Sequence, residues 1–164
     1  MSIIKTKSFQ LATYEKGDPN SPKLALVLPG RLDTKDYVHN TSLVDYLASR
    51  GYFTLSFDPP GTWESPGDIE LYTTTNYRKA VDELIEHFGN KPTLLAGHSR
   101  GGTIAMLAGP KNAHVTHFIS IFSYYGAPSD PEEERIVDGK VMSYRDLPPG
   151  NIKTKEQKEF GLPL

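Results

Sequence analysis

One serine stands between glycines in the stretch "LLAGHSRGG", residues 94–102. The apolar run at its start is typical of a buried strand, and the residues that follow Ser99 fit the beginning of a helix. Gly97 and Gly101 leave space for a sharp turn that lifts the Ser99 hydroxyl above a sheet. In such a turn the amide of Arg100, at the helix N-terminus, points to where a tetrahedral oxyanion would form. The spacing therefore predicts a nucleophilic serine for acyl transfer. A glycine-rich turn that only packs a helix against a strand remains the alternative interpretation.

A serine hydroxyl needs a general base and an acid that orients this base, and the sequence identifies neither. His98 adjoins Ser99, but we expect it to point away from the serine and to pack beneath the turn. His114 and His117 precede or lie within the next strand, so we expect them at the opposite end of the sheet. Asp130 follows a strand and could be an acid, although a solvated loop aspartate is the better interpretation.

Composition excludes several classes of function. The 164 residues have a formal net charge of -2, which provides no basic surface for nucleic acid. They contain no cysteine, which excludes disulfides, thiol catalysis and cysteine-based zinc sites. We predict no metal and no cofactor, because the only closely spaced histidines, His114 and His117, have no carboxylate nearby on their strand. No apolar run could span a membrane and no signal peptide begins the chain, so we expect a cytoplasmic protein.

Hydrophobic patterning predicts strands that alternate with helices. Buried strands are expected at 23–28, 52–58, 93–97 and 115–122, and a more exposed edge strand at 8–18. Helical spacing covers 38–48 and 76–88, and a further helix opens at 103 and runs to Gly109 and Pro110. Strands joined through helices form parallel sheets, because the crossovers are right-handed. The predicted class is α/β, a three-layer sandwich with a mostly parallel sheet and helices on both faces.

Residues 23–126 also resemble the α/β-hydrolase fold superfamily. "LVLPGRL" resembles its first strand and oxyanion loop, "FDPPGTWESPGD" the loop after the next strand, and "LLAGHSRGG" the nucleophile elbow. The resemblance implies an esterase-like serine hydrolase in which the backbone amides of Arg31 and Arg100 form the oxyanion hole around Ser99. Pro29 and Trp63 depart from the usual motif residues, but neither removes a backbone donor.

A change in composition also predicts a division of the chain, because prolines and charged residues dominate from about Ala127 onward and no long apolar stripe follows. Residues 1–126 would be the N-terminal part of the hydrolase core, and 127–164 a lid, a linker or a partly ordered tail. The family's later strands, which carry the acid and the base, have no counterpart before Leu164, so we expect a truncated hydrolase. Strand 115–122 would then form an exposed sheet edge, which a homo-oligomer or a C-terminal complement would cover.

The expected substrate is a small molecule with an acyl group. Four aromatic residues are expected on loops or strand ends near Ser99 and could contact an apolar acyl or alcohol group, although each could equally be a core aromatic: Trp63, Phe122, Tyr124 and Tyr125. A second function fits the same residues: a non-catalytic ligand-binding module that keeps the elbow only as architecture.

Overall fold

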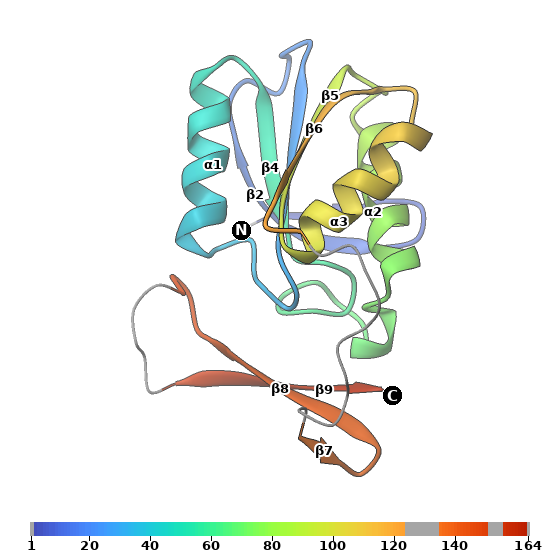
Figure 1. Cartoon of the computed structure of the whole chain (residues 1–164). Helices are drawn as coiled ribbons and strands as arrows, with labels where there is room; N and C mark the ends of the chain where they lie inside the picture. The colour runs from blue at the N-terminus through green and yellow to red at the C-terminus, as the bar shows by residue number, and fades with distance from the viewer. Residues whose placement is uncertain (1, 124–134, 151–155, 164) are drawn as a thin grey trace.

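The computed structural model describes residues 2–123, 135–150 and 156–163, and its larger part is a six-stranded sheet with the order β1-β2-β4-β3-β5-β6 (Figure 1). Strands β3 to β6 are parallel, and β1 and β2 run antiparallel to their neighbours. The strands are β1 (Ser2–Lys5), β2 (Gln10–Lys16), β3 (Leu24–Leu28), β4 (Phe53–Phe57), β5 (Thr93–His98) and β6 (Val115–Ile121). The helices are α1 (Val38–Ser49), α2 (Thr74–His87) and α3 (Arg100–Ala108), with short 3-10 turns η1 (Ile69–Leu71) and η2 (Gly109–Lys111). The predicted α/β sandwich is confirmed.

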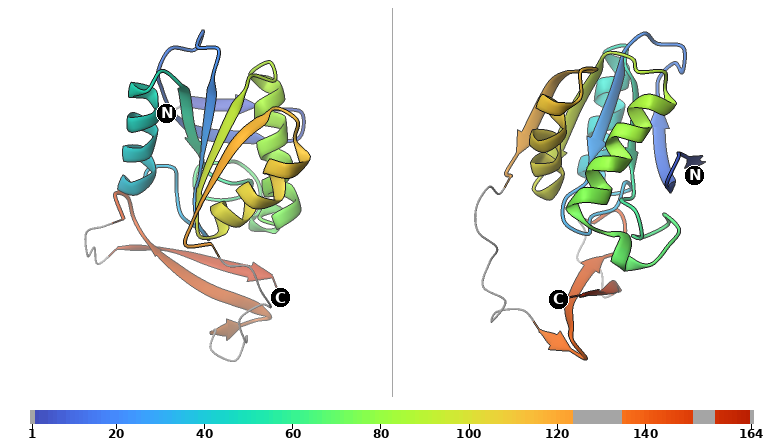
Figure 2. Two further views of the ribbon diagram at one scale, coloured as in Figure 1. Left: turned by 45° about the horizontal axis from the view of Figure 1, so that its top comes forward. Right: turned by 90° about the vertical axis from the view of Figure 1, so that its right-hand side faces the viewer.

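Helices cover both faces of this sheet. Figures 1 and 2 show α1 on one face and α2 with α3 on the other. The larger core lies beneath α2 and α3, where Tyr77 and Leu84 pack against Leu26 and Leu55. The smaller core joins Val44 of α1 to the opposite face of β3. A strand buried on both faces is usually a nearly continuous apolar run, and "LALVL" of β3 is such a run. No helix in the described parts of the chain is long and apolar enough to cross a membrane.

The predicted position of the N-terminal strand is wrong. Residues 8–18 were expected at the sheet edge, but β2 lies between β1 and β4. β1 pairs with β2 and forms the edge itself, so Leu11 and Ala12 of β2 are fully buried. Four residues with one buried side chain make β1 difficult to predict from the sequence.

Strand β6 forms the other edge, as expected, but the prediction that it is a buried strand is wrong. Phe118 and Ile119 are 45% and 46% exposed, and Phe122, which follows the strand, is 89% exposed. Within the described residues, β6 has a neighbouring strand, β5, on one side only. The apolar sequence predicted burial because such strands are usually covered on both sides.

A second, three-stranded antiparallel sheet lies beyond the carboxyl ends of the parallel strands (Figure 1). It consists of β7 (Ile136–Val137), β8 (Lys140–Asp146) and β9 (Gln157–Pro163). The guanidinium of Arg145 donates a hydrogen bond to the carbonyl of Arg31 (3.0 Å), and Phe160 packs into the main core. The sequence did not predict these strands, because only Val141 and Phe160 among them are buried. The domain division at residue 126 and the role of 127–164 as a lid remain predictions.

Candidate active site

Ser99 sits at a strained turn between β5 and α3. Its φ is +51°, in the left-handed region that costs a non-glycine residue about 1–3 kcal/mol. The Ser99 amide donates to the carbonyl of Ile121 (2.8 Å), and the amide of Thr103 donates to the Ser99 carbonyl (3.1 Å). The Ser99 side chain does not cap α3, whereas Thr73, before α2, accepts a capping bond from the amide of Asn76. The backbone is therefore held in a strained form that leaves the hydroxyl unused by the helix.

Two glycines make this turn sterically possible. A Cβ at Gly101 would overlap the carbonyl of Leu28, and a Cβ at Gly97 would overlap the backbone of Gly101. The start of α3 therefore presses against the ends of both β5 and β3. The sequence predicted this requirement from the spacing of the two glycines around Ser99.

The loop that follows β3 is held by three aromatic side chains. The Tyr77 hydroxyl donates to the carbonyl of Pro29 (3.0 Å), and the Tyr72 hydroxyl accepts a bond from the amide of Leu32 (2.9 Å). Trp63 Nε1 donates to the carbonyl of Leu32 (2.8 Å). The sequence missed both tyrosines, which stand among core positions. The available signal was chemical, since a buried tyrosine hydroxyl requires a polar partner.

Arg31 and Arg100 lie at the same end of adjacent strands. Leu28, the last residue of β3, is paired with Gly97 near the end of β5, so the two following segments start side by side. The Arg100 guanidinium lies 4.3 Å from the centre of the Tyr72 ring and donates to the hydroxyl of Thr74 (3.3 Å). The side chain thus extends toward α2. The assignment of both backbone amides as oxyanion donors remains a prediction.

The Trp63 side chain packs between the main sheet and the second sheet. Its ring lies edge-on to Phe160 of β9 (5.5 Å) and to Tyr37 (6.0 Å), and the Lys158 ammonium is 5.0 Å from it. These contacts account for a tryptophan in this loop without a substrate. Tyr124, Tyr125 and Asp130 lie outside the described residues, so their predicted roles remain predictions.

A buried ionic group joins the loops after β3 and β4. Asp58 is fully buried and accepts hydrogen bonds from the hydroxyl of Thr34 (2.8 Å) and the amide of Lys35 (2.9 Å). Burial raises the pKa of the Asp58 carboxyl, and the Lys35 ammonium partly opposes this shift. Burial also lowers the pKa of Lys35, but its bonds to Asp36 and Glu64 raise it above the ordinary value. The group fixes the loop that carries Arg31 against the neighbouring loop.

The histidines divide between the two ends of the sheet. His114 and His117 lie at the start of β6, where Val115 pairs with Thr93, so they are remote from Ser99, as expected. His98 is not packed beneath the turn. Its side chain is 41% exposed, and its Nδ1 lies 3.7 Å from the carboxylate of Asp33, which lies equally close to Nε2 of His39. The sequence missed this group because its members come from three separate segments.

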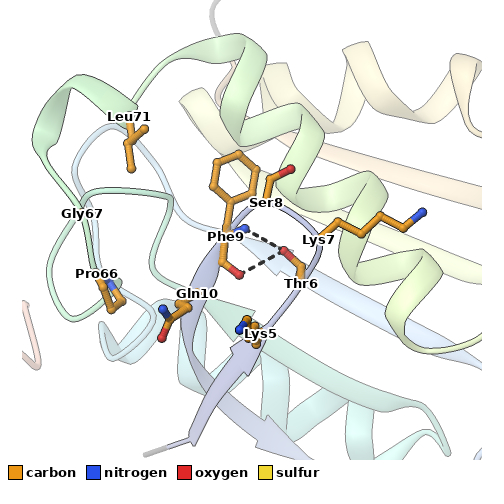
Figure 3. A pocket seen from close by; sticks show the side chains of 9 residues that line it. All are labelled: Lys5, Thr6, Lys7, Ser8, Phe9, Gln10, Pro66, Gly67 and Leu71. Atoms are coloured by element: carbon orange, nitrogen blue, oxygen red, sulfur yellow. Dashed lines mark hydrogen bonds between the residues drawn. The ribbon is translucent and has the colours of Figure 1, made fainter.

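A pocket of about 320 Å³ lies elsewhere, between the β1–β2 turn and the loop before η1 (Figure 3). Thr6 and Phe9 stabilise the turn by reciprocal hydrogen bonds of 3.2 Å. None of the residues that line this pocket was predicted as a site residue. This pocket is therefore not part of the site expected from the sequence.

The sequence of this chain is similar to one protein family and to several known proteins. The model of the alpha/beta hydrolase fold family matches residues 25–158. The palmitoyl-protein thioesterase ABHD10, mitochondrial, of Bos taurus is 26% identical over 160 residues, which are 98% of this chain and 47% of that protein. The Mus musculus protein of the same name is 23% identical over 164 residues, 99% of this chain and 51% of its own length. The chain thus spans about half the length of the curated relatives it matches.

Solved structures share the fold. Est1E from Butyrivibrio proteoclasticus, determined with bound ferulic acid, superposes with a TM-score of 0.66 at 21% identity over 92% of this chain and 66% of its own. The thioesterase domain from the curacin biosynthetic pathway has a TM-score of 0.66 at 20% identity, with coverage of 80% and 49%. Mouse alpha/beta hydrolase domain-containing protein 10 has a TM-score of 0.56 at 24% identity, with coverage of 68% and 45%.

Proposed function

Because the chain belongs to the alpha/beta hydrolase fold family, we propose that it forms the nucleophile-bearing part of a serine hydrolase that acts on ester or thioester acyl substrates. The observation that carries this proposal is Ser99 itself. A serine with φ +51° at a helix start, whose side chain does not cap that helix, is strained without benefit to stability. Strain of this kind is retained where the chemistry of a site uses it.

The proposed reaction proceeds through an acyl-enzyme. Ser99 Oγ attacks the acyl carbon while a general base accepts its proton, and the carbonyl oxygen becomes a tetrahedral oxyanion. The amides of Arg31 and Arg100 would donate to this oxyanion, with the positive end of α3 beside them. Collapse expels the alcohol or thiol, which takes the proton from the base. Water then attacks the acyl-enzyme by the same route and releases the acid and Ser99.

The proposal places the general base and its acid outside residues 1–164. His114 and His117 lie at the far end of the sheet from Ser99. The relatives are about twice as long as this chain, which leaves room in a protein of that length for the missing partners. A second chain that completes the sheet beside β6 is the alternative source.

The substrate class follows from the relatives only as a proposal. They are named palmitoyl-protein thioesterases, and we extend to this chain the acyl thioester class that this name states. The names of these relatives also include the word mitochondrial. They do not support the cytoplasmic location expected from the sequence, which remains a prediction.

A fluorophosphonate probe tests the nucleophile. The probe would be applied to a protein of the length of the relatives that contains residues 1–164, so that the base and acid are included. We expect covalent labelling that Ser99→Ala abolishes and that Ser49→Ala, on the exposed end of α1, leaves unchanged. Labelling that persists in Ser99→Ala would contradict the assignment. A folded protein without any labelling would favour the non-catalytic ligand-binding module.

A further inference from the structure

We propose that Asp33, His39 and His98 bind one divalent transition metal ion, of the class of Zn²⁺, beside the elbow. Asp33 belongs to the loop after β3, His39 to the first turn of α1, and His98 is the last residue of β5. The site is separate from the proposed role of Ser99, because it needs only these three side chains.

The three side chains converge on one point. Asp33 Oδ2 lies 3.7 Å from His39 Nε2 and 3.7 Å from His98 Nδ1, and all three ligand atoms lie within 4.8 Å of one another. In a tetrahedral site with bonds of about 2.1 Å, two ligand atoms are about 3.4 Å apart. The three ligand atoms are therefore slightly farther apart than they would be around a bound metal ion. His39 is 39% exposed, so its ring has room to close the remaining distance.

The same distances are poor for direct contacts. At 3.7 Å the Asp33 carboxylate is too far from either imidazole for a hydrogen bond. His98 Nδ1 is buried and has no hydrogen-bond partner in the part of the chain that the structure describes. A buried nitrogen without a hydrogen-bond partner is unfavourable, and a metal ion between it and the carboxylate would satisfy both groups.

Gly30 keeps this space open. A Cβ at that position would lie 2.5 Å from Asp33 Oδ2 and 3.2 Å from His98 Nδ1. The loop is also fixed from behind, since the buried side chain of Asn40 donates to the carbonyl of Thr34 (2.8 Å). The segment that carries Asp33 and the helix that carries His39 are thus held together before any ion binds.

Two pockets meet at His39 and His98 and provide access. One, of about 330 Å³, is mainly apolar and includes Leu43 and Phe122. The other, of about 370 Å³, is polar and includes Asp33 and Arg145. Two imidazoles and one carboxylate suit zinc and similar first-row metals better than magnesium or calcium, which prefer oxygen ligands alone. Coordination positions not filled by protein would face these pockets and take water or a ligand.

Calorimetric titration of the metal-stripped 164-residue chain with Zn²⁺ tests the site. We expect one ion per chain with micromolar or tighter affinity. Asp33→Asn and His39→Gln should each weaken binding by at least about tenfold, since each removes a ligand. The matched control, His114→Gln with His117→Gln, removes two histidines at the far end of the sheet and should retain the wild-type affinity. Ser99→Ala should also retain it, which separates this site from the proposed hydrolase activity.

The proposal is overturned if the wild-type chain binds no Zn²⁺ in this range, or if binding survives unchanged in His39→Gln. Loss of binding in the control pair but not in the site variants would overturn it equally. Circular dichroism melts without metal report whether each variant folds. If Asp33→Asn does not fold, His39→Gln decides the question, because its side chain is partly exposed on the surface of α1.

Discussion

Tyr72 shows how a residue remote from the reacting atoms can set the proposed oxyanion site. Its buried hydroxyl accepts the hydrogen bond of the Leu32 amide, directly after Arg31. Burial raises the pKa of this phenol, which the nearby Arg100 guanidinium opposes, so the group stays a neutral hydroxyl at ordinary pH. The loop geometry thus depends on one buried polar contact.

We expect Tyr72→Phe to destabilise the fold by about 1–3 kcal/mol, because the Leu32 amide loses its partner in a dry environment. Urea unfolding measures the change. The ring contact with Arg100 is retained, so lost packing does not explain the effect. Tyr46→Phe, on the exposed surface of α1, is the control and should change stability by less than about 0.5 kcal/mol. An equal effect of the two changes would contradict the role of the Tyr72 hydroxyl.

Gly101 supports a second prediction at the level of single residues. We expect Gly101→Ala to cost about 1–3 kcal/mol or more, since its methyl group would overlap the carbonyl of Leu28 in rigid backbone. Thermal unfolding followed by circular dichroism would detect the loss. Gly89→Asn is the control, because position 89 has open space and a positive φ that asparagine tolerates. A Gly101→Ala variant as stable as wild type would show that α3 can move away from β3.

Helices and strands were predictable from the sequence where their apolar residues recur with one regular helical or strand spacing. The steps of Tyr77, Ala80, Val81 and Leu84 predicted α2, and all four are buried. The hydrophobic spacing placed a helix only from 103, but α3 starts at Arg100, as the turn around Ser99 predicted, because the glycines after Ser99 carry no hydrophobic signal. The site shows the same division: the spacing around Ser99 follows from local sequence, whereas Asp33, His39 and His98 meet only through the pairing of β3 with β5.

One carboxylate attaches α2 to the β1–β2 turn. Glu83 is buried and accepts hydrogen bonds from the hydroxyls of Thr6 (2.7 Å) and Ser8 (2.6 Å) and from the amide of Ser8 (2.8 Å). Burial alone would raise the pKa of Glu83, but these bonds outweigh it and lower the pKa below its ordinary value of 4.5. A lowered folded-state pKa stabilises the protein above the unfolded-state value, and this contribution is lost as the pH falls through the folded-state pKa.

We expect Glu83→Gln to reduce the free energy of unfolding by about 1–3 kcal/mol at pH 7, since the charged acceptor of three bonds is replaced. The difference from wild type should shrink as the pH falls below 4.5, where the unfolded-state carboxyl protonates first, and should be lost as the pH passes the lower folded-state pKa. Urea unfolding at several pH values measures both effects. Glu86→Gln, which removes an exposed ion pair with Lys7, should change stability much less than Glu83→Gln, because solvent screens this pair. A Glu83 effect independent of pH would contradict this account.

At the scale of the whole molecule, the two sheets create the edge where all proposed chemistry lies. The second sheet contacts the loops after β3 and β4: the Tyr37 hydroxyl donates to the carbonyl of Asp146 (2.7 Å), and the Lys158 ammonium donates to the carbonyl of Trp63 (3.1 Å). These contacts join residues about a hundred positions apart. The loops after β3 and β4, which carry Arg31 and the proposed metal ligand Asp33, are therefore braced by the second sheet.

In contrast to these braced loops, the β6 edge is uncovered: within the described structure it exposes apolar side chains and unpaired backbone N–H and C=O groups. Ile119 is 46% exposed and Phe122 is 89% exposed. Soluble proteins blunt or cover such edges, because an uncovered strand pairs with another chain. We therefore expect the 164-residue chain to self-associate through β6, with a mass in light scattering that rises with protein concentration.

The position at which a single charge is introduced distinguishes association through β6 from nonspecific association. Ile119→Lys places a charge on β6 and should shift the chain toward a monomer, because lysine on an edge strand opposes further pairing. Tyr46→Lys introduces the same charge at a similarly exposed apolar position on α1 and should leave the association unchanged. If both variants dissociate equally, net charge rather than the edge controls association. If the wild-type chain is a monomer at every concentration, β6 does not recruit a second copy and the prediction is wrong.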